Sequence, residues 1–328
     1  MKIALMILNY NGEKFLKSYM PSIVQNSPKA SIYLIDNGSN DNSINYIKKN
    51  FPLIKLVLHK KNLGFCDGYN KAVNEIDAEL ICFMNNDVTV KNKWLPPIIN
   101  HFKKNPKTVI AQPHILDLKN PEYFEYAGAA GGFIDRLGYP YCRGRVFNNI
   151  EKDFGQFDKT QKIFWASGAC FFIRKKTFNS LNGFDSDFFA HQEEIDLCWR
   201  AFNRGLDIVS IGKSKVFHLG KGTLQSSPKK TFLNFRNSLL SLLKNLPEKK
   251  TQRICERLFW DYIAFLFFLI KLKPLDAFAI LRAHLSFFNL LSKIKNKKDL
   301  NSTNKQYFTI NNLPIKYFII GKKKFSSL

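Results

Sequence analysis

The first 90 residues alternate between short apolar runs and polar clusters. Four short apolar runs, each bounded by turn residues, extend from Ile3 to Leu8, Ile32 to Ile35, Ile54 to Leu58 and Leu80 to Met84, and Lys55 alone interrupts them. A short, uninterrupted apolar run is typical of a strand that is buried on both faces of a parallel sheet. We therefore expect four parallel strands in this part of the chain.

The residues between these runs have the spacing of helices. A first helix is expected from an apolar face made of Phe15, Leu16, Tyr19, Met20, Ile23 and Val24, and Pro21 is expected to kink or shorten it. A second helix should follow the cap-forming residues Ser39 to Ser43, and a third should cover Phe65 to Ile76. This repeated β-α-β pattern predicts an α/β fold with a doubly wound, mostly parallel sheet.

Polar clusters follow all four runs, at the point where each predicted strand ends. They are Asn9-Tyr10-Asn11, Asp36-Asn37-Gly38-Ser39, Asn62-Leu63-Gly64-Phe65 and Asn85-Asn86-Asp87. Open α/β sheets bind ligands outside the carboxyl ends of their strands, so we expect one shared site for a polar ligand. A nicotinamide cofactor is not expected, because the first turn lacks the GxGxxG pattern that lets a backbone approach a pyrophosphate.

Length and charge divide the chain into two parts. A chain of 328 residues is long enough for one large α/β domain and an extension. From Lys221 to Leu328 there are 21 Lys and Arg against 5 Asp and Glu, which is +16 of the total charge of +24. This basic region indicates either attraction to an anionic surface or a general excess of lysine in the sequence.

Cysteines and apolar segments favour a reducing compartment. The six cysteines stand alone, without the spacing of a zinc site or a disulfide framework. The first apolar run is too short for a signal peptide, and the run from Tyr262 to Ile270 is far below the roughly 18 residues that span a bilayer. We therefore expect a cytoplasmic or peripheral protein.

Three acids lie within four residues at the start of another predicted helix. They are Glu193, Glu194 and Asp196, followed by an apolar stripe and by Gly205 as the expected end of the helix. The positive end of a helix stabilises a carboxylate, which accounts readily for one acid. Three acids together indicate a functional site.

These motifs, in this order, resemble the inverting nucleotide-sugar glycosyltransferases of glycosyltransferase family 2, and in particular their rhamnosyltransferase-like branch. The resemblance covers about Lys2 to Leu240. It implies a Rossmann-like GT-A catalytic domain over residues 1–225, with a nucleotide-binding half at about 1–110 and an acceptor half at about 111–225. Residues 226–328 would form a basic, aromatic-rich helical extension.

The resemblance implies which residues bind the nucleotide sugar. Asp36 is expected to accept a hydrogen bond from uracil or thymine, and Arg236 to hold phosphate oxygens in a bidentate grip. The other expected donor-site residues are Asn9, Tyr10, Asn11, Asn37, Ser39, Asn62, Gly64, Asn85 and Asn86. The alternative for Asp36 to Ser43 is a turn and helix cap, and for Arg236 a solvated charge on a helix.

The resemblance also implies a divalent cation, Mn²⁺ or Mg²⁺. Where the family usually has Asp-x-Asp, this chain has Asn85-Asn86-Asp87, so Asp87 is the expected ligand. His218 lies in a segment similar to the family's His-x-Gly-Gly-Gly-Thr and is the expected second ligand. Two protein ligands suffice for a hard cation, because phosphate oxygens and water complete its coordination.

The family's catalytic base is an Asp, and that position falls on Glu194. The longer side chain changes the reach of the carboxylate, so Glu193 and Asp196 remain alternatives. Trp165 and Gly168 lie in a segment that resembles the acceptor side of the family's site. An inverting transfer needs one base and one group that stabilises the leaving diphosphate.

The expected function is transfer of a sugar from a UDP- or dTDP-sugar to a hydroxyl of a glycan or lipid-linked glycan in surface polysaccharide synthesis. The alternatives are a sugar nucleotidyltransferase, which should carry a Gly-rich, Arg-containing phosphate loop, and a basic nucleic-acid-binding protein. No recognisable nucleic-acid-binding motif supports the latter, so no nucleic acid partner is expected. The sequence leaves open whether the protein forms a homo-oligomer.

The tail from Cys255 to Lys298 combines aromatic residues with a basic end. Such helices lie in a membrane interface, with the aromatic rings at the headgroups and lysines near anionic lipids. The basic end consists of Lys293, Lys295, Lys297 and Lys298. The alternative is a helical hairpin that packs on the catalytic domain or on a second subunit.

Overall fold

The computed structural model describes residues 1–220, 227–295 and 306–328. The strands are β1 (Ile3–Asn9), β2 (Ser31–Asp36), β3 (Lys55–Leu58), β4 (Leu80–Asn85), β5 (Val88–Val90), β6 (Thr108–Asp117), β7 (Gly132–Ile134), β8 (Pro140–Cys142), β9 (Arg145–Val146), β10 (Asn149–Ile150), β11 (Gln161–Lys162), β12 (Cys170–Arg174) and β13 (Asp207–His218). The helices are α1 (Glu13–Asn26), α2 (Ser43–Asn50), α3 (Gly64–Asn74), α4 (Leu95–Lys104), α5 (Lys175–Ser180), α6 (Glu193–Asn203), α7 (Pro228–Asn245), α8 (Lys250–Ile270) and α9 (Pro274–Lys295). Short helical turns η1 (Ser186–Phe188), η2 (Ile315–Ile319) and η3 (Phe325–Ser327) complete the described elements.

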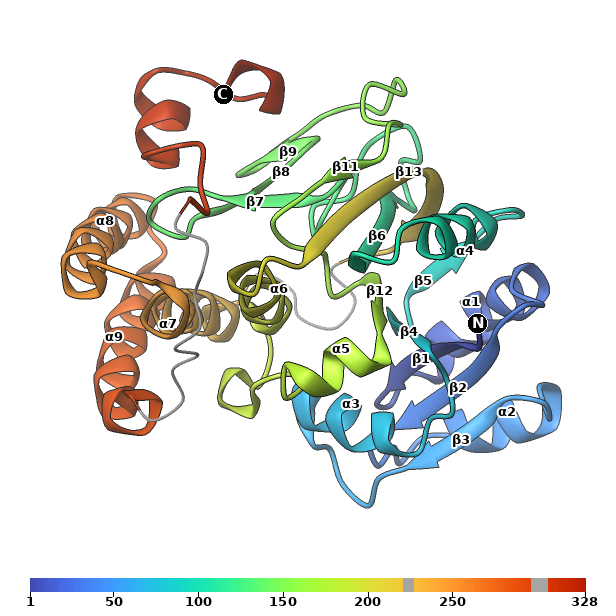
Figure 1. Cartoon of the computed structure of the whole chain (residues 1–328). Helices are drawn as coiled ribbons and strands as arrows, with labels where there is room; N and C mark the ends of the chain where they lie inside the picture. The colour runs from blue at the N-terminus through green and yellow to red at the C-terminus, as the bar shows by residue number, and fades with distance from the viewer. Residues whose placement is uncertain (221–226, 296–305) are drawn as a thin grey trace.

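A nine-stranded sheet forms the centre of the molecule (Figure 1). Its order is β11-β13-β6-β12-β4-β1-β2-β3, with β5 paired to β13. The four strands predicted from the apolar runs are β1 to β4, and they are parallel to one another, which confirms the predicted N-terminal half. Asn9 pairs with Asp36, and Leu8 with Asn85, so the carboxyl ends of three neighbouring strands are level.

The second half of the sheet is mixed. β12 runs antiparallel between β4 and β6, and β6 is parallel to β13. A separate four-stranded sheet, β10-β9-β8-β7, lies beyond it. The end of β13 therefore reaches the same edge as the end of β4, since β5, which follows β4 directly, pairs with the last residues of β13.

The predicted crossover helices are present as α1, α2 and α3. α1 buries Leu16, Met20 and Ile23 against the sheet, and it continues to Asn26 although Pro21 lies inside it. The expected shortening at Pro21 does not occur. The apolar face predicted for this helix is sufficient to hold it on the sheet.

Two hydrophobic cores cover the two faces of the central sheet. One of them joins residues of β1, β4 and α6 to Leu239, Leu240, Phe287 and Tyr307, which belong to the C-terminal region. Figure 1 shows α7, α8 and α9 together on the side of the molecule away from β1, β2 and β3. The packing thus crosses the boundary predicted at residue 225, although that boundary itself lies outside the described residues.

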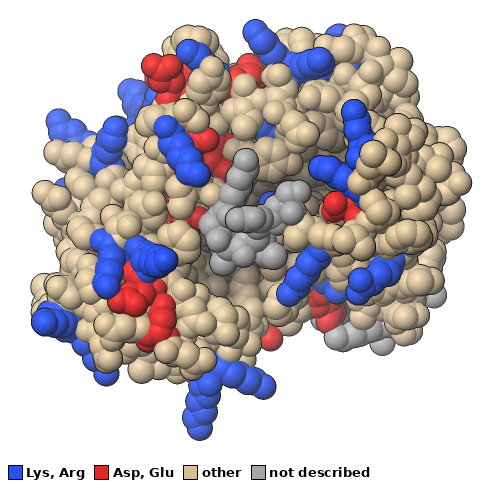
Figure 2. Space-filling view, turned by 180° about the vertical axis from the view of Figure 1, so that it is seen from behind, with Lys and Arg blue, Asp and Glu red and all other residues tan. Residues whose placement is uncertain are grey.

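The surface is basic, as the net charge requires. Figure 2 shows a face that is hollowed near its centre, with acidic side chains at several places around the hollow and Lys and Arg spread over the rest. Among the described helices, none has the length and hydropathy needed to cross a bilayer. The basic side chains predicted at the end of the tail, Lys293, Lys295, Lys297 and Lys298, lie outside the described side chains.

Candidate functional site

The carboxyl ends of β1, β2 and β4 carry a connected set of polar side chains. Asn9, which is 1% exposed, donates from Nδ2 to Asp36 Oδ1 at 3.1 Å and to Ser39 Oγ at 3.2 Å. The Ser39 backbone N–H donates to Asp36 Oδ2 at 2.8 Å, and Asn86 Nδ2 donates to Asn9 Oδ1 at 3.0 Å. The structure therefore brings these four predicted donor-site residues together.

Tyr10 and Asn11 border this cluster from the turn after β1. The Asn11 N–H donates to Ser39 Oγ at 2.9 Å, and its side-chain oxygen accepts from the Asn40 N–H at 2.8 Å. The Tyr10 side chain is 44% exposed. An exposed aromatic ring beside buried polar groups offers a flat surface on which a planar base can stack.

Asn37, Asn62 and Gly64 form a second set, which fixes the turn before α3. Asn37 Nδ2 donates to the Gly64 carbonyl at 2.9 Å and to Asn62 Oδ1 at 3.3 Å, and Asn62 Oδ1 also accepts from the Gly64 N–H at 2.9 Å. Gly64 has a φ of 76°, and a Cβ there would lie 3.1 Å from the Phe189 ring. Glycine fits this turn without strain. The amide groups of Asn37 and Asn62 therefore make hydrogen bonds within this set.

His218, at the end of β13, lies between two buried carboxylates. Its Nε2 is 3.0 Å from Asp87 Oδ1, and its Nδ1 is 3.2 Å from Glu125 Oε2. Burial opposes a charge on the imidazole, but the two carboxylates outweigh burial and raise the pKa of His218 to about 10. Asn85 lies beside it, with Nδ2 3.5 Å from His218 Nε2. The two residues predicted as metal ligands, Asp87 and His218, are therefore in direct contact.

The groups around His218 would fit a divalent cation that displaces the ring proton, since a histidine ligand has to be neutral. Carboxylate oxygen suits Mn²⁺ and Mg²⁺, and imidazole nitrogen is a ligand for many transition metals. Asp87 Oδ1 and His218 Nδ1 are buried and, in spite of their close contacts, have no well-aligned hydrogen bond. Glu125 at the second ring nitrogen would orient the imidazole, as carboxylates commonly do for histidine ligands.

A second group of potential ligands consists of His114, Asp153 and Asp158. The ammonium of Lys215 lies 2.5 Å from Asp153 and 3.5 Å from Asp158, so these carboxylates already share one cation. Burial is the main cause that lowers the pKa of His114 to about 3. This group is an ion pair beside a neutral histidine, and it is less suited to a metal ion because Lys215 already contacts both carboxylates.

The three acids of α6 occupy different surroundings. Asp196 is fully buried, and ion pairs with Arg200 at 2.8 Å and Lys244 at 2.7 Å outweigh its burial and lower its pKa. Glu193 is 5% exposed, and burial and the neighbouring Glu194 raise its pKa well above the usual value. Glu194 is partly exposed, and burial raises its pKa to about 7. These surroundings favour Glu194 as the proton acceptor and give Asp196 a structural role.

The loop before α6 has an unusual backbone. Phe189, His191 and Gln192 have positive φ values of 62°, 67° and 73°. Such conformations cost on the order of 1–3 kcal/mol each and persist only where the surroundings hold them. Asn237 of α7 supplies this support, because its Nδ2 donates to the carbonyls of residues 188, 190 and 191 at 3.0, 2.9 and 2.7 Å.

Arg236 supports the same loop. Its Nη2 donates to the carbonyls of Asp187 and Phe188 at 3.0 and 3.1 Å, and its Nε donates to Asn237 Oδ1 at 2.8 Å. The predicted grip on phosphate oxygens stays a prediction. The contacts give this guanidinium a different role, that of holding the loop that precedes Glu194.

Gly168 lies next to Glu194. A Cβ at Gly168 would be 3.8 Å from the Glu194 carboxyl carbon, and the neighbouring Ala169 carbonyl accepts from the Asn85 N–H at 3.0 Å. This segment therefore links α6 to the end of β4. Trp165 is only 3% exposed, and its indole N–H donates to a backbone carbonyl at 2.9 Å, so it supports the segment from within the core.

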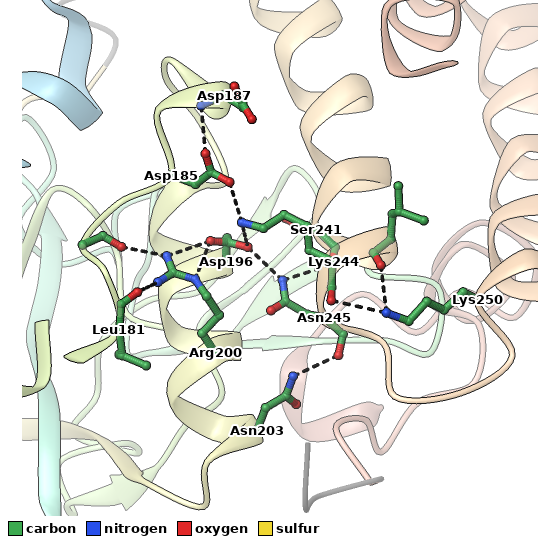
Figure 3. Close-up of polar contacts among 12 residues, drawn as sticks. Leu181, Asp185, Asp187, Asp196, Arg200, Asn203, Ser241, Lys244, Asn245 and Lys250 are labelled. Carbon is green, nitrogen blue, oxygen red and sulfur yellow. Dashed lines mark hydrogen bonds and ion pairs between the residues drawn. The ribbon is translucent and has the colours of Figure 1, made fainter. Parts of the chain in front are cut away.

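A buried network joins α6 to α7 (Figure 3). The Lys244 ammonium lies 2.8 Å from Asp185 and 2.7 Å from Asp196, and Asn245 Nδ2 donates to Asp196 Oδ1 at 2.8 Å. Arg200 Nε donates to the other oxygen of Asp196 at 2.8 Å. Loss of one partner from such a network leaves a buried charge unpaired, which is strongly destabilising. The network fixes the helix that carries Glu194.

Two residues of the site escaped sequence analysis. Glu125 lies in the aromatic and glycine-rich stretch from Gln112 to Lys162, where no motif is readable, and only the fold brings it to His218. Asn237 stands directly after Arg236, and the two resemble the Arg-Asn pair of the family, which is the one signal that points to it. An amide on a helix gives no local sign that it will support the backbone of a distant loop.

Comparison with known sequences agrees with this architecture. The family model described as Glycosyl transferase family 2 matches residues 5–181, more than half of the chain. The N-acetylglucosaminyl-diphospho-decaprenol L-rhamnosyltransferase of Mycobacterium tuberculosis is 24% identical over 224 residues, which are 63% of this chain and 71% of that protein. The O-antigen biosynthesis protein RfbC of Myxococcus xanthus is 26% identical over 151 residues, which are 45% of this chain and 12% of that protein.

Solved structures share the fold. GalNAc-T7 with UDP, GalNAc and Mn²⁺ has a TM-score of 0.61 at 17% identity, covering 76% of this chain and 49% of that chain. S. aureus TarS 1–349 in complex with UDP-GlcNAc has a TM-score of 0.59 at 13% identity, covering 91% and 84%. The molecule thus has an α/β fold of the GT-A type with a C-terminal helical region. With the family model matching more than half of its length, the chain belongs to glycosyltransferase family 2.

Proposed function

We propose that this protein is an inverting, metal-dependent glycosyltransferase that moves a sugar from a UDP- or dTDP-sugar to a hydroxyl group of a glycan or lipid-linked glycan. The observation that carries the proposal is the position of Glu194. Its carboxyl group lies beside Gly168, and the neighbouring Ala169 is bonded to Asn85 at the end of β4, two residues before Asp87, which contacts His218. A base and a cation site at one sheet edge are the two elements that an inverting transfer needs.

In this proposal the cluster around Asp36 binds the nucleobase. Asp36 accepts the N3–H of uracil or thymine, and the Tyr10 ring stacks on the base. Asn9 and Ser39 keep the Asp36 carboxylate in place through their hydrogen bonds. Asn86 connects this pocket to the diphosphate side, because its amide bonds Asn9 and it directly precedes Asp87.

Asp87 and His218 are the residues that would hold Mn²⁺ or Mg²⁺, with Glu125 orienting the imidazole. When bound, the cation supplies positive charge that offsets the charge of the departing nucleoside diphosphate. Asn85 is within reach of His218 and belongs to the same side of the pocket.

Glu194 acts as the base in this proposal. Its carboxylate accepts the proton of the acceptor hydroxyl while that oxygen forms a bond to the anomeric carbon from the face opposite the diphosphate. The bond from the anomeric carbon to the diphosphate oxygen breaks, and the configuration inverts. Gly168 leaves room for the acceptor, because any side chain there would approach the Glu194 carboxyl group.

The named relatives support the acceptor class. One is named as a rhamnosyltransferase acting on a diphospho-decaprenol-linked sugar, and another as an O-antigen biosynthesis protein. We therefore place the protein in surface polysaccharide synthesis, in the cytoplasm and peripheral at the inner face of the membrane. Neither a sugar nucleotidyltransferase nor a nucleic-acid-binding protein accounts for Glu194 together with the contact between Asp87 and His218.

A thermal-shift titration tests the proposal. The protein is titrated with UDP, dTDP, GDP, NAD and a short RNA, each with and without Mn²⁺, because a ligand that binds the native state raises its stability. We expect UDP or dTDP to raise the Tm, and Mn²⁺ to increase that shift. A variant Asp87→Asn should keep the nucleotide response but lose the increase due to Mn²⁺.

The matched control is Asp153→Asn, which alters the other group of potential ligands. It should leave the effect of Mn²⁺ on nucleotide binding unchanged. If the Asp153 variant rather than the Asp87 variant lost that effect, the cation would have to be reassigned. A shift with RNA and none with any nucleotide would overturn the transferase proposal.

A further inference from the structure

The helical region carries most of the exposed large apolar side chains of the described chain. On α8 they recur every three or four residues and form one stripe, namely Phe259, Tyr262, Ile263, Leu266, Phe267 and Ile270. A second stripe on α9 consists of Leu275, Phe278, Leu281, Leu285 and Phe288, and a third group is Phe318, Ile319 and Ile320. We call these residues, with Leu272 in the turn between the helices, the apolar face.

Ring contacts show that the parts of the apolar face adjoin. The Phe267 and Phe318 ring centroids are 6.3 Å apart, which brings residues 318–320 beside α8. Phe265 and Phe278 are also 6.3 Å apart, which brings α9 beside α8. Leu272, at 88% exposed, lies at the tip of this hairpin. A continuous exposed apolar surface of this kind marks a binding surface.

The charges near the apolar face are cationic. Lys271 and Lys273 flank Leu272 and are exposed, and Lys322 and Lys323 follow the third group. In residues 257–292 and 306–328 the only acids are Asp261, which is fully buried with Arg257, and Asp276, which accepts from Thr231. Both acids have partners within the protein, whereas Lys271, Lys273 and Lys323 are exposed.

We propose that the apolar face docks the protein on an anionic lipid membrane, with α8 and α9 lying in the plane of the interface. An amphipathic helix buries its apolar side at the boundary of headgroups and acyl chains, and nearby lysines attract anionic headgroups. This orientation is consistent with the described helices, none of which is long and apolar enough to span a bilayer. The apolar face is thus the surface that would contact the membrane in the peripheral location proposed above, and anionic lipid is what it would bind. This does not depend on the assignment of the catalytic residues.

Charge argues against a second copy as the occupant of this face. A dimer formed through the apolar face would bring two sets of outward lysines together, among them Lys271 and Lys273 of each copy. No exposed acid in residues 257–292 and 306–328 is available to compensate them. An anionic lipid surface removes this repulsion, because its charge is opposite.

Vesicle sedimentation of the full chain tests the proposal. Vesicles of phosphatidylcholine alone are compared with vesicles that also contain phosphatidylglycerol, at low and high salt. We expect binding to the anionic vesicles that weakens with salt. The variant Lys271→Ala with Lys273→Ala should bind about 25-fold more weakly, since each lysine contributes about a fivefold factor near such a surface. The variant Ile270→Ser with Leu272→Ser should lose at least tenfold.

Matched controls alter similar residues elsewhere. Lys48 and Lys49 lie at the exposed end of α2, and Leu53, at 94% exposed, is an apolar residue remote from the helical region. Lys48→Ala with Lys49→Ala, and Leu53→Ser, should leave vesicle binding unchanged. All these side chains are exposed, so the variants should keep the Tm of the parent chain.

Two outcomes would overturn the inference. One is absence of binding to anionic vesicles, or binding that the control substitutions weaken as much as those in the apolar face. The other is a concentration-dependent dimer, measured by sedimentation velocity without lipid, that Ile270→Ser with Leu272→Ser dissociates while vesicle binding is absent. Nucleotide-induced stabilisation, measured on the same samples, separates failure of this inference from failure of the proposed function.

Discussion

At the scale of single residues, Glu194 gives the sharpest test of the site. Burial raises its pKa to about 7, so the carboxylate is protonated below this pH and cannot accept a proton. We expect kcat/KM for sugar transfer to rise with pH through about 7 and then to level off. Glu194→Gln should lower kcat by roughly 10²–10⁴-fold, the usual contribution of a general base.

The comparison variant is Glu193→Gln, one position earlier. Glu193 is almost fully buried, and its loss should affect stability more than the pH profile. Full activity in Glu194→Gln, with collapse in Glu193→Gln, would move the base to Glu193. The pH profile of Glu194→Asp, which keeps a carboxylate, should retain its acidic limb at lower activity.

A second prediction concerns Glu125, which contacts the imidazole of His218 at 3.2 Å. Glu125→Gln removes the charge that orients this ring, and loss of such a partner typically weakens metal binding by about 10- to 100-fold. Calorimetric titration with Mn²⁺ in the presence of UDP measures the effect. Glu122→Gln alters an exposed neighbour that pairs with Lys152, and it should leave the affinity unchanged.

Residue types and order were enough to predict which strand ends carry polar side chains. Asn9, Asp36 and Asn86 meet because their strands are adjacent and level. Distances between side chains could not be predicted. Arg236 illustrates this, because two kinds of partner suit its side chain. The same guanidinium donors of Arg236 that suit a phosphate also suit the loop carbonyls that they contact.

At the scale of elements, the loop between η1 and α6 is held in place by α7. Asn237→Ala removes the donor to three carbonyls of a strained loop, and we expect a stability loss of about 2–4 kcal/mol, since each buried unpaired group costs about 1–3 kcal/mol. The loop positions Glu194, so kcat should fall about 10- to 100-fold, with little change in the affinity for the nucleotide.

Asn234→Ala is the matched control on the same helix. Asn234 lies about one turn earlier on α7 and is partly exposed. It should change neither kcat nor the Tm by more than a small amount. Equal loss of nucleotide affinity and kcat in Asn237→Ala would indicate general unfolding instead of a displaced loop.

The elements of the N-terminal half were predictable because each signal is local. Apolar runs of four to six residues are strands, and their spacing leaves room for one helix between them. The left-handed residues Phe189, His191 and Gln192 were not predictable, since none of them is glycine. Their conformation depends on a helix that begins some 35 residues later in the chain.

At the scale of the whole molecule, the C-terminal helices share a core with the catalytic half. The family resemblance predicted a helical extension over residues 226–328, and the excess of basic residues from Lys221 onward agreed with it. Leu239 and Leu240 nevertheless pack in one cluster with residues of the central sheet, and Lys244 pairs with Asp185 and Asp196. Composition indicates which side chains are exposed on α8 and α9. The packing of these helices depends instead on the side chains that they bury.

This shared core predicts that the molecule unfolds as one unit. In a variant with Phe in place of Trp94, Trp165 and Trp199, fluorescence reports only Trp260 on α8, while far-UV circular dichroism reports the entire chain. We expect the two urea transitions to have the same midpoint, because a two-state domain loses all its structure together. A Trp260 transition at clearly lower urea would mean that α8 and its neighbours unfold first. The C-terminal helices would then be an appendage, as their composition had suggested, and not a part of the catalytic unit.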